Sequence, residues 1–292
     1  MEETSTQNQQ RLRPHAILWL DGLATEQRQD LLTVEEPLEI RLGGQPVAVL
    51  MRTPQDDFDL VAGFLYTEGM IGRPQDLGAL SYCASARPPN LENIVEVHLA
   101  TGVHFDLERF RRNFYASSSC GICGKASIEA IRAQAPPLVG NFRVHRDLLF
   151  TLDEQLRQGQ AVFARTGSLH AAALFDPEGE LLVVREDVGR HNAVDKVIGT
   201  YVRAGQPPPP GVLMVSGRAS FEIVQKALMA GIAVVAAVSA PSTLAVELAQ
   251  ESGMTLVGFL RGQRANVYSG EQRLTGCRPG GQPKEHWRDR DV

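Results

Sequence analysis

The chain has 292 residues, of which 43% are hydrophobic and 22% charged, and this balance predicts one large or two ordinary globular domains with a sizeable core. The formal net charge of -5 excludes a general attraction to nucleic acid or to anionic membranes. No apolar run reaches the roughly 18 residues that span a bilayer, and the polar N-terminal segment lacks the apolar stretch of a signal peptide, so a cytoplasmic protein without membrane partners is expected.

The first half of the chain has the pattern of a small α+β unit. Residues 1–14 are polar and are expected to form a disordered tail. Residues 37–52 alternate apolar and polar side chains around two glycines, which predicts a β-hairpin. Thr53 is then expected to cap a helix, and residues 93–100 form another strand. We therefore expect an α+β subdomain over residues 15–135.

The second half alternates between helices and apolar strands. Helices are predicted over 125–134, 146–160, 191–205, 220–231 and 241–253, a hairpin over 171–187, and strands over 212–217, 232–239 and, last, 254–261. Such alternation predicts a parallel or mixed sheet that is covered on both faces, in an α/β domain over 136–270. The Gly/Pro-rich end, residues 271–292, is expected to be a tail.

The stretch SSSCGICGK places Cys120 and Cys123 in a loop of small and polar residues, just before a predicted helix. A thiolate is stabilised near a helix N-terminus or a cation such as Lys125, so the loop is a candidate reactive-thiol site. A structural zinc site needs a second ligand pair, whereas Cys83 and Cys277 are isolated. A redox dithiol is less favoured because the loop does not open a βαβ unit.

Polar residues recur where predicted strands end and helices begin. In REDVGRHNAVDKVIG, Arg190 and the first helical amides suit an anion, although a solvated helix start explains the charges equally well. Arg218 lies between a strand and a helix, where α/β sheets bind ligands. Arg261 and Arg264 suit a phosphate or pyrophosphate. Together these residues predict a phosphate-binding rim, while His170, alone at a strand start, is more typical of a structural histidine.

Several motifs occur in one order between about Pro37 and Arg273: SSSCGICGK, LHAAALF, REDVGRHNAVDKVIG, VSGRASFEIVQKALMAGI, SAPSTLAVELAQESGMTLVGFLRG and NVYSG. Together they resemble the FdhD family of formate dehydrogenase accessory sulfurtransferases. The resemblance implies a sulfur carrier that takes persulfide sulfur from a cysteine desulfurase. It then passes the sulfur to the molybdenum (or tungsten) bis(pterin guanine dinucleotide) cofactor before this cofactor enters formate dehydrogenase. The cofactor is expected as a bound substrate, and no structural metal is expected.

The resemblance also implies a cytidine-deaminase-like three-layer sandwich with the smaller N-terminal α+β subdomain beside it. This fold raises the possibility of a zinc deaminase. Such enzymes need a His-x-Glu motif and a proline before the Cys-x-x-Cys pair. None of the seven histidines is followed two positions later by Glu, and Ser119 precedes Cys120. Deaminase activity is therefore rejected while the fold is kept.

The family's site residues map onto two parts of this chain. The resemblance implies that Cys120 carries the persulfide and Cys123 assists, although the local sequence, with Lys125 near Cys123, favours the reverse. The implied cofactor-binding segment is Phe259, Leu260, Arg261, Gly262, Gln263 and Arg264. We infer that Arg218, Arg190 and His191 line the same pocket.

Two questions about assembly and role stay open from the sequence. The cofactor has two similar nucleotide arms, and a symmetric homodimer would offer two equivalent pockets, so a homodimer is predicted. The alternative function is a non-catalytic chaperone for the molybdenum cofactor, whose cysteines only regulate binding. The same rim would serve either role.

Overall fold

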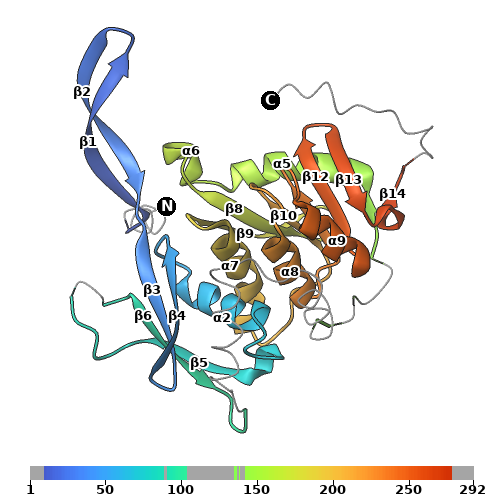
Figure 1. Ribbon diagram of the computed structural model, residues 1–292, viewed down its shortest axis with the longest axis horizontal. Helices are drawn as coiled ribbons and strands as arrows, with labels where there is room; N and C mark the ends of the chain where they lie inside the picture. The colour runs from blue at the N-terminus through green and yellow to red at the C-terminus, as the bar shows by residue number, and fades with distance from the viewer. Residues whose placement is uncertain (1–9, 89–90, 104–134, 137, 139–141, 278–292) are drawn as a thin grey trace.

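The computed structural model describes residues 10–88, 91–103, 135–136, 138 and 142–277. Within this part the chain is a mixed α/β protein built around a six-stranded and a four-stranded sheet (Figure 1). Its α-helices are α2 (Asp57–Thr67), α5 (Arg146–Gln158), α6 (Phe163–Thr166), α7 (Arg190–Arg203), α8 (Phe221–Met229) and α9 (Thr243–Glu251). The helix predicted over 125–134 lies outside the described residues. No described helix has the length and apolar character that a bilayer crossing requires.

The four-stranded sheet contains the hairpin predicted over 37–52. Its strands, in spatial order, are β4 (Gln45–Arg52), β3 (Glu36–Leu42), β6 (Ile94–Leu99) and β5 (Leu77–Tyr82). Gly43 and Gly44 both have positive φ angles in the turn between β3 and β4, a conformation that glycine adopts without steric cost. The hairpin and the strand predicted over 93–100 are thus confirmed.

The helix after this hairpin begins at Asp57, so the prediction that Thr53 caps it is wrong. Gln55 and Asp56 have φ angles of 84° and 54°, which interrupt a helical path between Thr53 and the helix. Thr53 instead binds the second half of the chain. Its amide donates to the Asp187 carboxylate at 3.2 Å, and its carbonyl accepts from Lys196 at 2.9 Å. Tertiary contacts therefore override the local capping preference.

The six-stranded sheet forms the centre of the second half. Its strands, in spatial order, are β13 (Arg264–Ser269), β12 (Thr255–Arg261), β11 (Val234–Ala237), β10 (Val212–Val215), β8 (His170–Phe175) and β9 (Leu181–Asp187). Pairing shows that β9, β10, β11 and β12 run in one direction, whereas β8 and β13 run in the other. The mixed sheet is confirmed, but 254–261 is not the last strand, because β13 pairs with it along the sheet edge.

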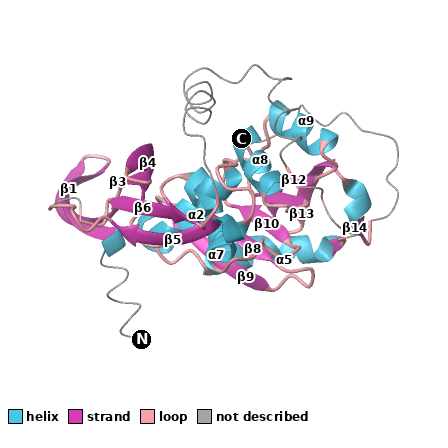
Figure 2. Ribbon diagram, turned by 90° about the horizontal axis from the view of Figure 1, so that it is seen from below, coloured by secondary structure: helices cyan, strands magenta, loops and turns pink. Residues whose placement is uncertain are grey.

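Helices cover this sheet on both faces, as predicted. Ala172 and Leu174 of β8 belong to a core cluster with α7, α8 and α9, whereas Ala171 and Ala173 belong to a second cluster with α5. Alternate side chains of a strand point to opposite faces, so the sheet lies between two helical layers. Figure 2 shows α8 and α9 on one side of the sheet and α5 on the other.

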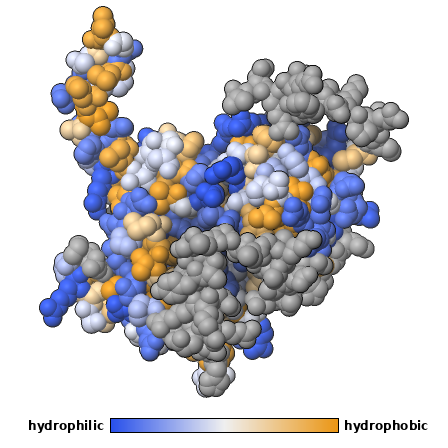
Figure 3. All heavy atoms as spheres, viewed as in Figure 1, coloured by the Kyte–Doolittle hydropathy of each residue, from blue (hydrophilic) through white to orange (hydrophobic). Residues whose placement is uncertain are grey.

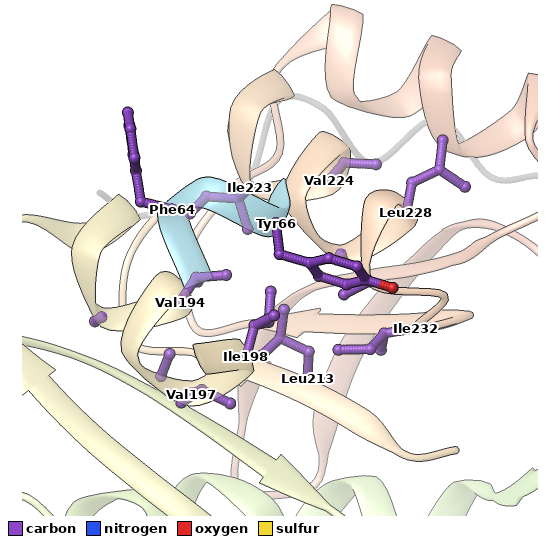
Figure 4. Close-up of a cluster of buried hydrophobic side chains, with 14 of the residues drawn as sticks. Phe64, Tyr66, Val194, Val197, Ile198, Leu213, Ile223, Val224, Leu228 and Ile232 are labelled. Carbon is purple, nitrogen blue, oxygen red and sulfur yellow. The ribbon is translucent and has the colours of Figure 1, made fainter. Parts of the chain in front are cut away.

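Helix α2 joins the two halves through very close contact with α7. A Cβ atom at Gly63 would lie 1.9 Å from the Asp195 carbonyl oxygen, and one at Gly199 would lie 1.7 Å from that of Asp59. Only glycine allows two helix backbones to approach this closely. Phe64 of α2 lies in one buried cluster with side chains of α7 and α8 (Figure 4). The two sheets therefore share a core.

The ends of the described chain contain more structure than predicted. Strands β1 (Leu12–Asp21) and β2 (Ala24–Thr33) form a hairpin that projects from the body, and β1 begins within the tail predicted over 1–14 (Figure 1). Figure 3 shows hydrophobic residues along this hairpin up to its tip. After β13, the segment predicted as the C-terminal tail contains a short strand, β14 (Leu274–Thr275). This strand pairs with β7 (Val144–His145).

Candidate functional site

The predicted catalytic pair, Cys120 and Cys123, lies outside the described residues. The other two cysteines, Cys83 and Cys277, are free thiols. Across residues 10–88, 91–103, 135–136, 138 and 142–277, no group of three His, Cys, Asp or Glu side chains is placed to hold a metal ion. The candidate site that the structure describes is therefore the polar rim of the six-stranded sheet.

The direction of the strands gathers helix N-termini at this rim. Strands β9, β10 and β11 run in the same direction. The helices that follow them, α7, α8 and α9, therefore all begin at the end of the sheet where these strands finish. Their N-cap residues are Gly189, Ser220 and Ser242. The first amides of a helix lack intrahelical acceptors and carry the positive end of the helix dipole. The predicted edge is thus suited to anions.

Two predicted site residues, Arg190 and Arg218, lie here beside His170. Antiparallel β8 starts where β9 ends, so His170 is opposite Asp187. A Cβ atom at Gly217 would lie 3.4 Å from His170 Nδ1 and 3.9 Å from Arg190 Cδ. Burial, reinforced by the charges of Arg190 and Arg218, lowers the pKa of His170. His170, expected to be structural, is therefore a member of this cluster.

His191 lies beside Ser220, the N-cap residue of α8. Its Nε2 atom is 3.2 Å from Ser220 Oγ and 3.7 Å from the Glu222 carboxylate. Burial, followed by the charges of Arg190 and Lys226, lowers the pKa of His191 to about 4. The imidazole is accordingly neutral at physiological pH and can donate one hydrogen bond and accept another.

We expect His191 to remain uncharged when the pH falls from 8 to 5.5, because its pKa of about 4 lies below that range. An unperturbed histidine titrates near 6.5 and would change charge within it. The C2 proton of His191, assigned through a His191→Gln spectrum, should therefore keep its chemical shift over this range. A midpoint above 6 would contradict the buried position. In the unfolded chain His191 binds a proton already near pH 6.5, whereas in the folded protein it does so only near pH 4. As the pH falls through this range, protonation favours the unfolded chain, and the free energy of unfolding decreases.

The rim arginines lack partners, unlike most arginines of the described chain. Ten described arginines form ion pairs with carboxylates: Arg11, Arg13, Arg28, Arg41, Arg52, Arg73, Arg146, Arg157, Arg185 and Arg203. No described residue pairs with the side chains of Arg190, Arg218, Arg261 or Arg264. The Nε atom of Arg190 is also buried without a hydrogen-bond partner in the described part. Such an atom is costly unless a ligand satisfies it.

The segment predicted to bind the cofactor, 259–264, forms the end of β12 and the turn into β13. Phe259 has a φ of 52°, which is unusual for an aromatic residue, and its amide donates to the Ser239 carbonyl. Leu260 is fully buried in the α5 cluster, so only its backbone could contact a ligand. Arg261 and Arg264 are exposed and lie opposite each other. Arg261, Arg264 and the exposed Gln263, rather than Leu260, are the side chains that this segment presents.

A buried ion pair that sequence patterns do not reveal lies beneath the rim and stabilises it. Lys196 Nζ lies 2.8 Å from the Asp187 carboxylate, and both side chains are almost fully buried. Asp187 also accepts from the amide of Gly189 and from Asn192. These bonds fix the junction between β9 and α7, and so they position Arg190 and His191.

Comparisons with known proteins show which family the chain resembles. Residues 33–275 match the FdhD/NarQ family model. A protein of Streptomyces avermitilis named sulfur carrier protein FdhD is 55% identical over 264 residues, covering 87% of this chain and 92% of the relative. A protein of the same name from Mycobacterium tuberculosis is 53% identical over 256 residues, covering 85% and 93%.

A solved structure supports the fold. It is a proposed formate dehydrogenase accessory protein from Desulfotalea psychrophila, with a TM-score of 0.72 and 22% identity, covering 90% of this chain and 99% of that one. The family match over most of the sequence and the relatives above 50% identity lead to one conclusion. The chain belongs to the FdhD/NarQ family.

Proposed function

We propose that this protein is a sulfur carrier that serves the maturation of formate dehydrogenase. The names of its relatives support sulfur transport. The observation that carries the cofactor part of the proposal is a rim of arginines over helix N-termini that have no ion-pair partner among the described residues. Such a rim suits the pyrophosphates of a bis(pterin guanine dinucleotide) cofactor, since the planar guanidinium group binds phosphate through two parallel hydrogen bonds. Segment 259–264 would hold a guanine nucleotide, with Arg218, Arg190 and His191 nearby.

The proposed chemistry is sulfur transfer through Cys120. Its thiolate attacks the terminal sulfur of a cysteine desulfurase persulfide, whose S–S bond breaks as the desulfurase thiolate leaves. Cys120 then carries the sulfur as its own persulfide. Attack by the Cys123 thiolate on the Cys120 sulfur forms a disulfide and releases sulfide to the molybdenum of the bound cofactor. The two thiolates supply the electron pair that reduces the sulfur.

The proposal also includes the setting in which this chemistry takes place. We propose a cytoplasmic homodimer whose two chains offer equivalent pockets to the two nucleotide arms. The sheet between two helical layers is compatible with the cytidine-deaminase-like fold that the family resemblance implies.

Intact mass of the purified protein after incubation with a cysteine desulfurase and cysteine tests this proposal. We expect a gain of one sulfur atom that a thiol reductant reverses, because a persulfide is a reducible S–S bond. Omission of cysteine is the control and should give no gain. A protein that binds guanine nucleotides but never gains sulfur would instead be the non-catalytic cofactor chaperone.

A further inference from the structure

We propose that His170, Arg190 and Arg218 form an oxyanion subsite that is separate from segment 259–264. The subsite lies at the N-termini of α7 and α8 and takes a phosphate group or the oxo-bearing metal end of a ligand. This proposal rests on the proposed function only for the source of the anion. The subsite itself follows from charge, burial and geometry.

The charge balance of the cluster favours an anion. Arg190 and Arg218 bring two permanent positive charges, and no described carboxylate pairs with either of them. Asp187, which lies opposite His170, is occupied by Lys196 at 2.8 Å. Glu222 lies 3.7 Å from His191 and feels the charge of Arg190, but it forms no ion pair with Arg190. A half-buried arginine without a counterion is unfavourable, and a bound anion would supply the missing partner.

A glycine brings the main chain close to this cluster. Gly217 follows β10 and has no side chain, and the atoms nearest to its missing Cβ belong to His170 and Arg190. An anion held by these two side chains would therefore lie close to the main chain of Gly217. Helices α7 and α8 span 14 and 9 residues, and both direct their first amides toward this edge. Burial lowers the pKa of both histidines, which favours their neutral, hydrogen-bonding forms over charged ones.

The strand order separates this subsite from the nucleotide segment. Arg218 follows β10 and Arg261 ends β12, and β11 lies between them. Two strand spacings amount to about 10 Å. A phosphate held against Gly217 therefore cannot also contact the backbone of 261–264. The two subsites would bind different groups of one extended ligand.

Titration calorimetry of the full chain with inorganic phosphate, pyrophosphate and molybdate tests the subsite. Arg218→Ala should weaken binding about 10- to 100-fold, the loss expected for a charged hydrogen bond. Arg218 is exposed and has no described partner, so this variant should fold normally. Gly217→Ala should leave the Tm unchanged, because the added Cβ meets only ordinary contacts of 3.4 Å or more. The same methyl group should weaken binding, because it occupies space beside the proposed anion. The exposed Arg87 lies on the loop between β5 and β6, and Arg87→Ala should bind like the wild type.

The outcomes decide both whether the subsite exists and which anion it takes. Tighter binding of phosphate or pyrophosphate would assign the subsite to a phosphate of the ligand, and tighter binding of molybdate would assign it to the metal end. Wild-type affinity in both Arg218→Ala and Gly217→Ala, or loss only in Arg261→Ala, would overturn the proposal. A wild-type chain that binds these anions through Arg218 but takes no sulfur would refute the sulfur-carrier function and leave the subsite standing.

Discussion

Replacing Cys120 with alanine should reduce formate dehydrogenase activity to the level of a deletion strain, in a cell that depends on this protein. The proposed carrier holds sulfur in a covalent bond to this residue, and alanine offers no atom that could form it. Formate oxidation by cell extracts measures the loss. The purified variant should keep the Tm of the wild type, which shows that the fold is intact.

The chain offers matched controls for this substitution. Cys83 and Cys277 are free thiols in the described part, and Cys83→Ala and Cys277→Ala should retain activity. Cys123→Ala should still gain sulfur from the desulfurase but release it slowly. Sulfur loading that persists in Cys120→Ala and vanishes in Cys123→Ala would exchange the two roles, as the local sequence favours. Normal formate dehydrogenase activity without both thiols would refute the sulfur-carrier mechanism.

The parts of the fold that could be predicted from the sequence are those in which local pattern and tertiary role agree. The runs VLMV and VVAA are continuously apolar because β10 and β11 are buried on both faces, and this pattern identifies them as strands. Strand β13 is mostly exposed at a sheet edge, so its sequence, RANVYS, has no such pattern. The β1–β2 hairpin has no predictive pattern either, because most of its side chains are exposed and no buried face imposes an alternation on them.

The candidate site divides in a similar way. The gathering of helix N-termini at the rim could be predicted, since helices that follow parallel strands all begin at the end of the sheet where those strands finish. The hairpin predicted over 171–187 already sets the start of β8 opposite the end of β9, near Arg190. A single histidine at a strand start, however, does not by itself indicate a ligand site. Nor does the sequence reveal which charges are buried. Lys226 binds Asp195 and Glu68 within the core, yet in the sequence it resembles any lysine on a helix.

The buried pair of Lys196 and Asp187 gives the largest effect on stability that we expect. The Lys196→Met variant keeps most of the side-chain volume but removes the cation from Asp187. The side chain of Asp187 is 0% exposed, so its carboxylate is left buried and unpaired. Breaking a buried ion pair in this way costs about 3–5 kcal/mol of the free energy of unfolding. Urea denaturation at pH 7 measures the change.

Two further variants separate the ion pair from a simple loss of charge. Arg13 pairs with Glu36 on the surface and is 72% exposed, so Arg13→Met should cost no more than about 1 kcal/mol. Adding Asp187→Asn to Lys196→Met should recover part of the loss, because the neutral amide carries no unpaired charge and can still accept from the Gly189 amide. If Lys196→Met costs no more than Arg13→Met, the pair does not stabilise the junction between β9 and α7, and Arg190 must be positioned by other contacts.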